Sequence, residues 1–241
     1  MNFIEFQCFI LRLEGSFVKP SIMKVKTCEV NPYVELMYTE FKDYSFDETA
    51  SENAGKWRSQ VFNCDDNTPL DLEIGTGNGT HFAKLTESYP DRMFIGLELK
   101  FKTLVQSIRR SLRAGCTNGR MARYRAEGVA ELFEKEEINN VYIHFPDPWP
   151  KKRHNKNRLI QTEFLNNLYS VMKPGSFIEF KTDDYDYFKW AVKYFRSSSF
   201  TISFFSEDLH NSFRKDKNFV THFESLFLNK GQPIYYCRLR K

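Results

Sequence analysis

The stretch Leu70-Asp-Leu-Glu-Ile-Gly-Thr-Gly-Asn-Gly79 predicts the fold of this chain. Residues 70–74 read as a strand, and residues 80–89 read as the helix that follows it. The three glycines between them allow the backbone to turn tightly and to approach a ligand that a Cβ atom would exclude. We therefore predict a strand, a ligand-binding loop and a helix in direct succession.

Strands and helices alternate from this stretch onward, which is the pattern of a parallel sheet with helices on both faces. The predicted strands are residues 70–74, 92–99, 121–126, 140–145 and 177–181, and the predicted helices are residues 80–89, 100–113, 129–137, 159–172 and 185–195. Residues 200–205 and 233–239 read as two further strands, paired as an antiparallel hairpin with a long insertion between them. The fold class is therefore α/β.

The length of 241 residues allows one sizeable domain. We predict an N-terminal extension of unknown role at residues 1–35 and the domain at residues 36–241, which begins with helical fragments up to residue 62. Residues 3–13 are apolar but carry Glu5 and Arg12, so we expect neither a signal peptide nor a membrane span.

The cysteine usage points to a reducing compartment. The chain has five cysteines, an odd number, and no Cys-x-x-Cys pair. This pattern favours reduced thiols in the cytoplasm, and it argues against a disulfide framework or a zinc site. We therefore predict a cytoplasmic protein without a metal. The net charge of +4 is too modest to indicate a nucleic-acid binder by itself.

Acidic residues stand near the ends of the first three predicted strands: Glu73, Glu98 and Glu127. A carboxylate beside the glycine loop would repel a pyrophosphate, but it would attract the amino group and sulfonium of S-adenosylmethionine. Glu98 is placed to accept hydrogen bonds from both ribose hydroxyls. Glu127 is placed to accept a hydrogen bond from the adenine amino group. A nicotinamide cofactor stays open as the less favoured alternative.

The second informative stretch is His144-Phe-Pro-Asp-Pro-Trp-Pro-Lys-Lys-Arg-His-Asn-Lys-Asn-Arg158, which follows the apolar run Val141-Tyr-Ile143. Ligands bind beyond the carboxyl ends of strands in open α/β sheets, so Asp147 should lie at such a rim. The prolines on either side of it restrict its backbone. The Lys and Arg side chains that follow would neutralise phosphates without reading bases. The plainer alternative is a proline turn before a solvated basic loop.

These motifs, together with Gly96-Leu-Glu98, Lys181-Thr-Asp183 and Thr221-His-Phe-Glu224, resemble the bacterial tRNA (guanine-N7)-methyltransferases of the TrmB type. The resemblance covers about residues 54–240, and the loop around Asp147 is its most specific part. It implies a Rossmann-like, seven-stranded class I methyltransferase sheet. It also implies S-adenosylmethionine as cofactor, tRNA as partner, and methyl transfer to N7 of guanosine 46 in the variable loop.

The resemblance assigns roles to residues in four groups. The expected cofactor contacts are Glu73, Gly75, Gly77, Gly79, Glu98, Glu127 and Asp147, and Asp147 is also the expected catalytic residue. The expected substrate contacts are Lys151, Asp183, Thr221, His222, Phe223 and Glu224. The expected RNA-contacting segment is Arg153, His154, Asn155, Lys156, Asn157 and Arg158. Two residues depart from the family pattern: Glu127 stands where aspartate is usual, and Asn157 where a basic residue is common.

Local alternatives remain for two of these motifs. Asp183 has the position of a helix N-cap before Tyr185, and the spacing of Thr221 and Glu224 is that of a capping box. At the level of function, the alternatives are a methyltransferase that acts on another RNA site or a small molecule, and an RNA-binding protein on a decayed methyltransferase scaffold. No membrane partner is expected, and the choice between monomer and homodimer is open.

Overall fold

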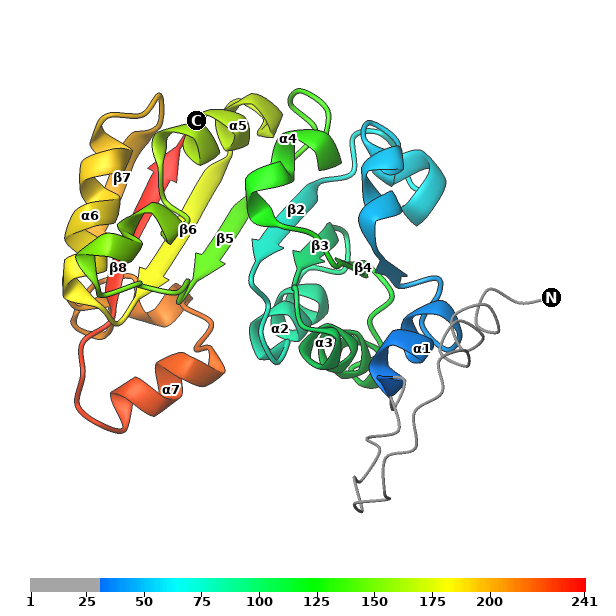
Figure 1. Ribbon diagram of the computed structural model, residues 1–241, viewed down its shortest axis with the longest axis horizontal. Coiled ribbons are helices and arrows are strands. Elements are labelled where there is room, and N and C mark those ends of the chain that lie inside the picture. The colour runs from blue at the N-terminus through cyan, green and yellow to red at the C-terminus, as the bar shows by residue number, and fades with distance from the viewer. Residues whose placement is uncertain (1–30) are drawn as a thin grey trace, which may run out of the picture. The chain divides into compact units, whose positions relative to one another are not determined.

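Eight strands form one sheet in the computed structural model, which describes residues 31–241 as a single unit (Figure 1). Their order is β1-β4-β3-β2-β5-β6-β8-β7. The predicted extension at residues 1–35 lies outside the described residues as far as residue 30, and its boundary stays a prediction. Within residues 31–241, no helix has the length and apolar character needed to span a membrane.

The described residues contain strands and helices at the following positions. The strands are β1 (Ser45–Phe46), β2 (Leu70–Ile74), β3 (Met93–Leu97), β4 (Gly119–Ala122), β5 (Val141–His144), β6 (Phe177–Thr182), β7 (Thr201–Ser206) and β8 (Tyr235–Arg240). The α-helices are α1 (Pro32–Tyr38), α2 (Thr80–Ser88), α3 (Phe101–Arg113), α4 (Val129–Leu132), α5 (Thr162–Val171), α6 (Tyr185–Arg196) and α7 (His222–Leu228). Short 3-10 turns and one π-helix, Trp57–Phe62, connect them.

The predicted α/β fold with an antiparallel C-terminal hairpin is confirmed. Strands β1 to β6 pair in parallel, and β8 pairs antiparallel with both β6 and β7. Two predictions of detail were wrong. The sheet has eight strands where seven were expected, because two residues of the predicted helical region form β1 beside β4. The helix predicted at residues 129–137 ends at Leu132, since Phe133 has an extended backbone.

The chain reverses its direction of travel across the sheet at the pair β2 and β5. Strands β3 and β4 follow β2 on one side, whereas β6 follows β5 on the other. Ile74 and Ile143 are register partners, so the carboxyl ends of the two strands lie next to each other. This is the topological switch point at which open α/β sheets bind their ligands.

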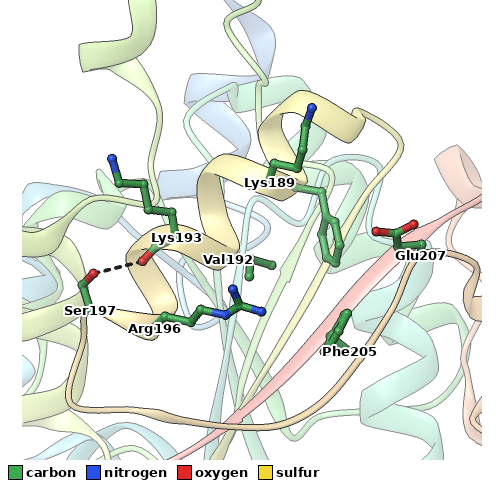
Figure 2. Close-up of a pocket in the computed structure, with 8 residues that line it drawn as sticks. Lys189, Val192, Lys193, Arg196, Ser197, Phe205 and Glu207 are labelled. Atoms are coloured by element: carbon green, nitrogen blue, oxygen red, sulfur yellow. Dashed lines mark hydrogen bonds between the residues drawn. The ribbon is translucent and has the colours of Figure 1, made fainter.

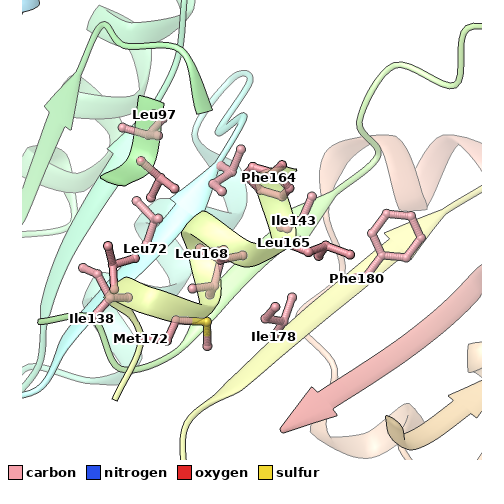
Figure 3. Packing of buried hydrophobic residues seen from close by; sticks show 14 of the residues in the cluster. Leu72, Leu97, Ile138, Ile143, Phe164, Leu165, Leu168, Met172, Ile178 and Phe180 are labelled. Carbon is pink, nitrogen blue, oxygen red and sulfur yellow. The ribbon is translucent and has the colours of Figure 1, made fainter. Parts of the chain in front are cut away.

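One face of the sheet is apolar and packs against α5 (Figure 3). Ile143 and Phe180 are register partners on this face, and both are fully buried. Phe164 and Leu168 of α5 belong to the same core. Each such side chain contributes roughly 1.5–3 kcal/mol when it is fully buried. This core holds β2, β5 and β6 rigidly beneath the rim.

The opposite face carries buried polar side chains on the same strands. Glu73, Tyr142 and Glu179 are register partners, and so are His144, Lys181 and Tyr236. Partners in neighbouring strands project to the same face. We call these six residues the buried polar layer, since each is at most 9% exposed. Charged side chains buried in this way need partners, because an unpaired charge is costly in a protein interior.

Candidate active site

The glycine loop lies against the end of β3. The backbone N–H groups of Gly75 and Thr76 donate to the carbonyl of Leu97, at 2.9 and 3.2 Å. The N–H of Gly77 donates to Oε2 of Glu98 at 3.0 Å. The structure therefore brings the predicted glycine loop and the predicted ribose-binding acid into direct contact.

Two properties of the glycines suit a ligand site. A Cβ atom at Gly75 or Gly77 would meet no protein atom within 4 Å, so the loop backbone faces open space. Gly79 has a φ of +76°, and a Cβ atom there would lie 2.4 Å from Cα of Ser107. Only glycine can bring the loop this close to α3. The loop is thus closed against the protein on one side and open to a ligand on the other.

Glu73 is buried and already has a partner within the protein. It is 2% exposed, and its Oε2 atom lies 3.1 Å from Nδ1 of His81 on α2. The sequence reasoning did not single out His81, because a histidine early in a helix has no distinguishing pattern. The expected contact between Glu73 and a cofactor amino group therefore has a competitor within the protein.

Glu127 lies at a pocket of about 410 Å³ that also contains part of the basic loop. Its side chain is exposed and pairs with Arg125 at 3.0 Å. The other residues that line the pocket are Lys156, Asn157, Arg158, Leu159, Gln161, Thr162, Glu163, Phe164 and Tyr194. The structure thus brings an expected adenine contact next to expected RNA contacts.

Asp147 is exposed in the loop that follows β5. Phe145 and Trp149, on either side of it, have φ values of +53° and +45°. Bulky residues in this left-handed region cost about 1–3 kcal/mol each, and such strain clusters at functional sites. Phe145 also stacks on Phe227 of α7, with ring centroids 5.7 Å apart. Asp147 therefore lies at the rim in a loop that is strained on both sides and packed against α7.

The basic loop separates into exposed side chains and one buried one. Lys151, Arg153 and Lys156 are exposed, whereas Arg158 is 6% exposed. Nε of Arg158 donates to the carbonyl of Pro148 at 2.7 Å, and its guanidinium lies over the ring of Trp190, 4.9 Å from the centroid. The structure places Arg158 as a brace for the loop, turned away from solvent.

Asp183 lies half-buried at the end of β6. Burial raises the pKa of its carboxyl, and the charge of Asp184 raises it further. The N-cap of α6 is Asp184, which accepts from the N–H of Tyr187 at 2.7 Å. The capping role considered for Asp183 thus belongs to its neighbour. A carboxyl with a perturbed pKa at a sheet rim is typical of functional sites.

The motif Thr221-His-Phe-Glu224 divides into two pairs. Thr221 and Glu224 are buried and form the capping box that their spacing suggests. His222 and Phe223 are exposed at the start of α7. The four residues therefore do not all face one ligand.

Glu224 joins the insertion to the sheet. It is fully buried, and its Oε2 atom accepts from Nζ of Lys181 at 3.1 Å. Nε2 of His210 lies 2.6 Å from its Oε1 atom. Lys181 also donates to Asn218. Sequence reasoning assigned no role to Lys181, although it lies two residues before Asp183 and ties the α7 segment to β6.

A second hollow, of about 420 Å³, lies between α6 and β7 (Figure 2). Lys189, Lys193 and Arg196 of α6 line it, together with Phe205 of β7. Lys189 is paired with Asp186 at 3.0 Å. None of the predicted site residues lines this hollow, so we place the candidate site at the rim above β2, β5 and β6.

Comparison with known proteins identifies the family of this chain. A family model described as "Putative methyltransferase" matches residues 67–237. The tRNA (guanine-N(7)-)-methyltransferase of Bdellovibrio bacteriovorus is 51% identical over 203 residues, which cover 84% of this chain and 97% of that protein. The enzyme of the same name from Clostridium novyi is 38% identical over 187 residues, which cover 78% and 86%.

The solved structures support the fold. The structure of an antibiotic-related methyltransferase matches with a TM-score of 0.52 and 22% identity, over 72% of this chain and 87% of that one. Three observations therefore agree on one family: the sheet with its antiparallel end, the glycine loop at the switch point, and the extent of the sequence identity. The chain belongs to the family of the tRNA (guanine-N7)-methyltransferases.

Proposed function

We propose that this protein transfers a methyl group from S-adenosylmethionine to N7 of guanosine 46 in the variable loop of tRNA. The observation that carries the proposal is that carboxylates follow three parallel strands at the same edge of the sheet. Glu98 follows β3 and contacts the glycine loop, whereas Asp147 follows β5 and Asp183 follows β6. The names of the relatives support the choice of substrate. A cytoplasmic location, expected from the cysteines, belongs to the same proposal.

The residues present fit this cofactor. The open side of Gly75 and Gly77 admits a nucleoside, and Glu98 is close enough to the loop to accept from ribose hydroxyls. Glu127 is the expected adenine contact. Glu73 would bind the amino group only by sharing its carboxylate with His81. When bound, S-adenosylmethionine supplies an electrophilic methyl group on a sulfonium.

The protein's part in the reaction is to orient the base and to stabilise charge. N7 of guanine carries a lone pair in the neutral base, so no proton has to be removed before attack. The ring becomes cationic as the methyl group arrives, and fixed carboxylates stabilise that charge where water is excluded. Asp147 and Asp183 are the carboxylates that we assign to this role.

The direct test of the function is to incubate the protein with unmodified tRNA and S-adenosylmethionine labelled in the methyl group. We expect label in 7-methylguanosine at position 46, and none in transcripts whose guanosine 46 is replaced by adenosine. Label at another position or atom would replace this proposal with the alternative of a different RNA site. No transfer, despite binding of tRNA, would favour the non-catalytic alternative.

Neutralising the basic loop is expected to weaken tRNA binding and its salt dependence. In a variant with Lys151, Lys152, Arg153 and Lys156 changed to glutamine, four exposed cations are lost. Each phosphate contact contributes about 0.7–0.9 to the slope of log K against log salt, so the slope should fall by about three. Filter binding between about 50 and 200 mM salt measures it. Replacing the exposed Lys84 and Lys135 by glutamine is the control, and an unchanged slope in the loop variant would contradict the assignment.

Asp183→Asn is expected to raise stability slightly while it lowers activity. The pKa of Asp183 is higher in the folded protein than in the unfolded chain, because the site is partly buried. Its contribution to stability is therefore present at acidic pH and is lost as the pH rises through that raised pKa. At pH 7 the charged carboxylate disfavours folding, and asparagine removes this penalty. The rate of methyl transfer should fall about 100-fold or more, since one preorganised charge is lost.

Melting temperatures at pH 7 and near pH 3.8, the ordinary pKa of this carboxyl, check the prediction, with the gain in the variant larger at pH 7. The control is Asp184→Ala, which removes the N-cap of α6 and should cost about 1 kcal/mol at either pH. An Asp183→Asn protein that melts earlier at pH 7 would show that Asp183 has a structural role, and one that methylates at the normal rate would refute its catalytic role.

A further inference from the structure

Three buried side chains converge at the polar face of the sheet, and none of them was assigned to the methyl-transfer site. His81 comes from α2, His144 from β5 and Glu179 from β6. One potential ligand atom of each lies within 4.8 Å of the others, and all three side chains are buried. The rings of His81 and His144 meet edge to face, with centroids 4.4 Å apart. Two imidazoles and one carboxylate in this proximity are a set of ligands that zinc enzymes use.

His144 is the unexplained member of this cluster. It is 8% exposed, and neither of its ring nitrogens has a hydrogen-bond partner. Its Nε2 atom nevertheless lies 3.3 Å from Oε1 of Glu179. An unpaired polar group is costly in a protein interior, so a partner is expected. Two atoms about 3.3 Å apart that are not aligned for a hydrogen bond have the separation of two ligands of one tetrahedral ion, each about 2.0–2.1 Å from it.

The surroundings orient two of the three ligands. Oε2 of Glu73 contacts Nδ1 of His81 at 3.1 Å, which leaves the Nε2 atom of that ring to offer its lone pair to a metal. The hydroxyl of Tyr236 donates to Oε2 of Glu179 at 2.8 Å, which leaves Oε1 on the side of His144. Metal-binding histidines and carboxylates are usually held by such outer partners, above all by a carboxylate behind a histidine.

We propose that His81, His144 and Glu179 bind a Zn²⁺ ion, with Glu73 as the outer partner of His81. Imidazole ligands favour zinc over Mg²⁺, which prefers oxygen. The ion would tie α2 to β5 and β6 beneath the rim that carries the glycine loop and Asp147. This binding site shares Glu73 with the proposed cofactor site, but its test needs neither tRNA nor S-adenosylmethionine.

The charges around the cluster can accommodate a divalent ion. Nζ of Lys181 lies 3.9 Å from Oε1 of Glu179, but the lysine is already paired with Glu224 at 3.1 Å. Arg214 and Arg238 approach the other oxygen of Glu179, and both side chains retain contact with solvent. The carboxylates of Glu179 and Glu73 bring two negative charges to the ion, and Glu179 shares its charge with these cations. The sequence predicted no metal, because its ligands are far apart along the chain and form no recognisable spacing.

The test is to purify the protein without metal and to add ZnCl₂ or MgCl₂. We expect one zinc ion to stay bound per chain after gel filtration, a melting temperature raised by zinc, and no effect of magnesium. His144→Gln should abolish retention of zinc. His154→Gln, which changes a histidine outside the cluster, should retain it.

Cobalt provides a readout that does not depend on the variants. Co²⁺ bound to two imidazoles and a carboxylate in tetrahedral geometry should give visible absorption in the wild-type protein, and zinc should displace it. The proposal is overturned if the wild-type protein retains no zinc and shows no cobalt spectrum. It is also overturned if a folded His144→Gln protein binds zinc as the wild type does, because the ion would then occupy another site.

Discussion

Asp147→Asn is expected to lower kcat for methyl transfer to tRNA about 100- to 1000-fold, the usual loss when one preorganised electrostatic group is removed. Asparagine keeps the size of the side chain but loses the negative charge opposite the developing cation. Phe145 and Trp149, on either side of this residue, have strained backbones, as is common at functional sites. The loss should therefore appear in catalysis, while the melting temperature stays nearly unchanged, since Asp147 is exposed.

Single-turnover kinetics with saturating tRNA separate this effect from binding. Affinity for S-adenosylhomocysteine, measured by calorimetry, should change little if the role of Asp147 is mainly in the transition state. Asp186→Asn is the matched control, because Asp186 is an exposed acid that pairs only with Lys189 among the described residues. Near-normal methyl transfer by the Asp147→Asn protein would refute our assignment of the catalytic carboxylate.

Lys181→Met is expected to destabilise the protein by about 3–5 kcal/mol, because it leaves the fully buried carboxylate of Glu224 without its cationic partner. For a chain of this size the loss corresponds to a fall in melting temperature of roughly 10 °C. The α7 segment should loosen first, since Lys181 also donates to the carbonyl of Phe219 there. Urea unfolding measures the free energy, and hydrogen exchange measures the loosening.

The double variant Lys181→Met, Glu224→Gln tests the cause. Glutamine removes the unpaired buried charge but keeps an acceptor for the capping box with Thr221, so part of the lost stability should return. Lys189→Met, which breaks the exposed pair with Asp186, should change stability by less than about 1 kcal/mol. If the double variant is no more stable than Lys181→Met, the buried pair does not account for the loss.

The strands and the glycine loop could be predicted because their signals are local. Strand β2 has the bounds that its apolar pattern indicates, and the C-terminal hairpin was recognisable despite the insertion between its strands. The short elements could not be placed well. Strand β4 begins at Gly119, two residues before its predicted start, and β1 is only two residues long. Elements this short have too few residues to show a period.

The parts of the candidate site that belong to a sequence motif could be predicted. Contacts between residues that are distant in the chain could not. The contact between Gly77 and Glu98 follows from the order of strands and loops. The pairing of Lys181 with Glu224 does not, because the sequence does not show which face of β6 the insertion covers. Arg158 illustrates a further limit. It belongs to a charge run that looks solvated throughout, yet its guanidinium lies inside on Trp190.

The position of β8 between β6 and β7 has a consequence for biosynthesis. Among the described residues, β7 pairs only with β8, which the ribosome makes later, after the insertion that carries α7. Until β8 has been synthesised, both edges of β7 are therefore unpaired, and Phe204 and Phe205 have no strand beside them. Nascent chains halted before residue 235 should thus expose an aggregation-prone strand with unpaired edges and need a chaperone. Chains that have been released with β8 in place should not.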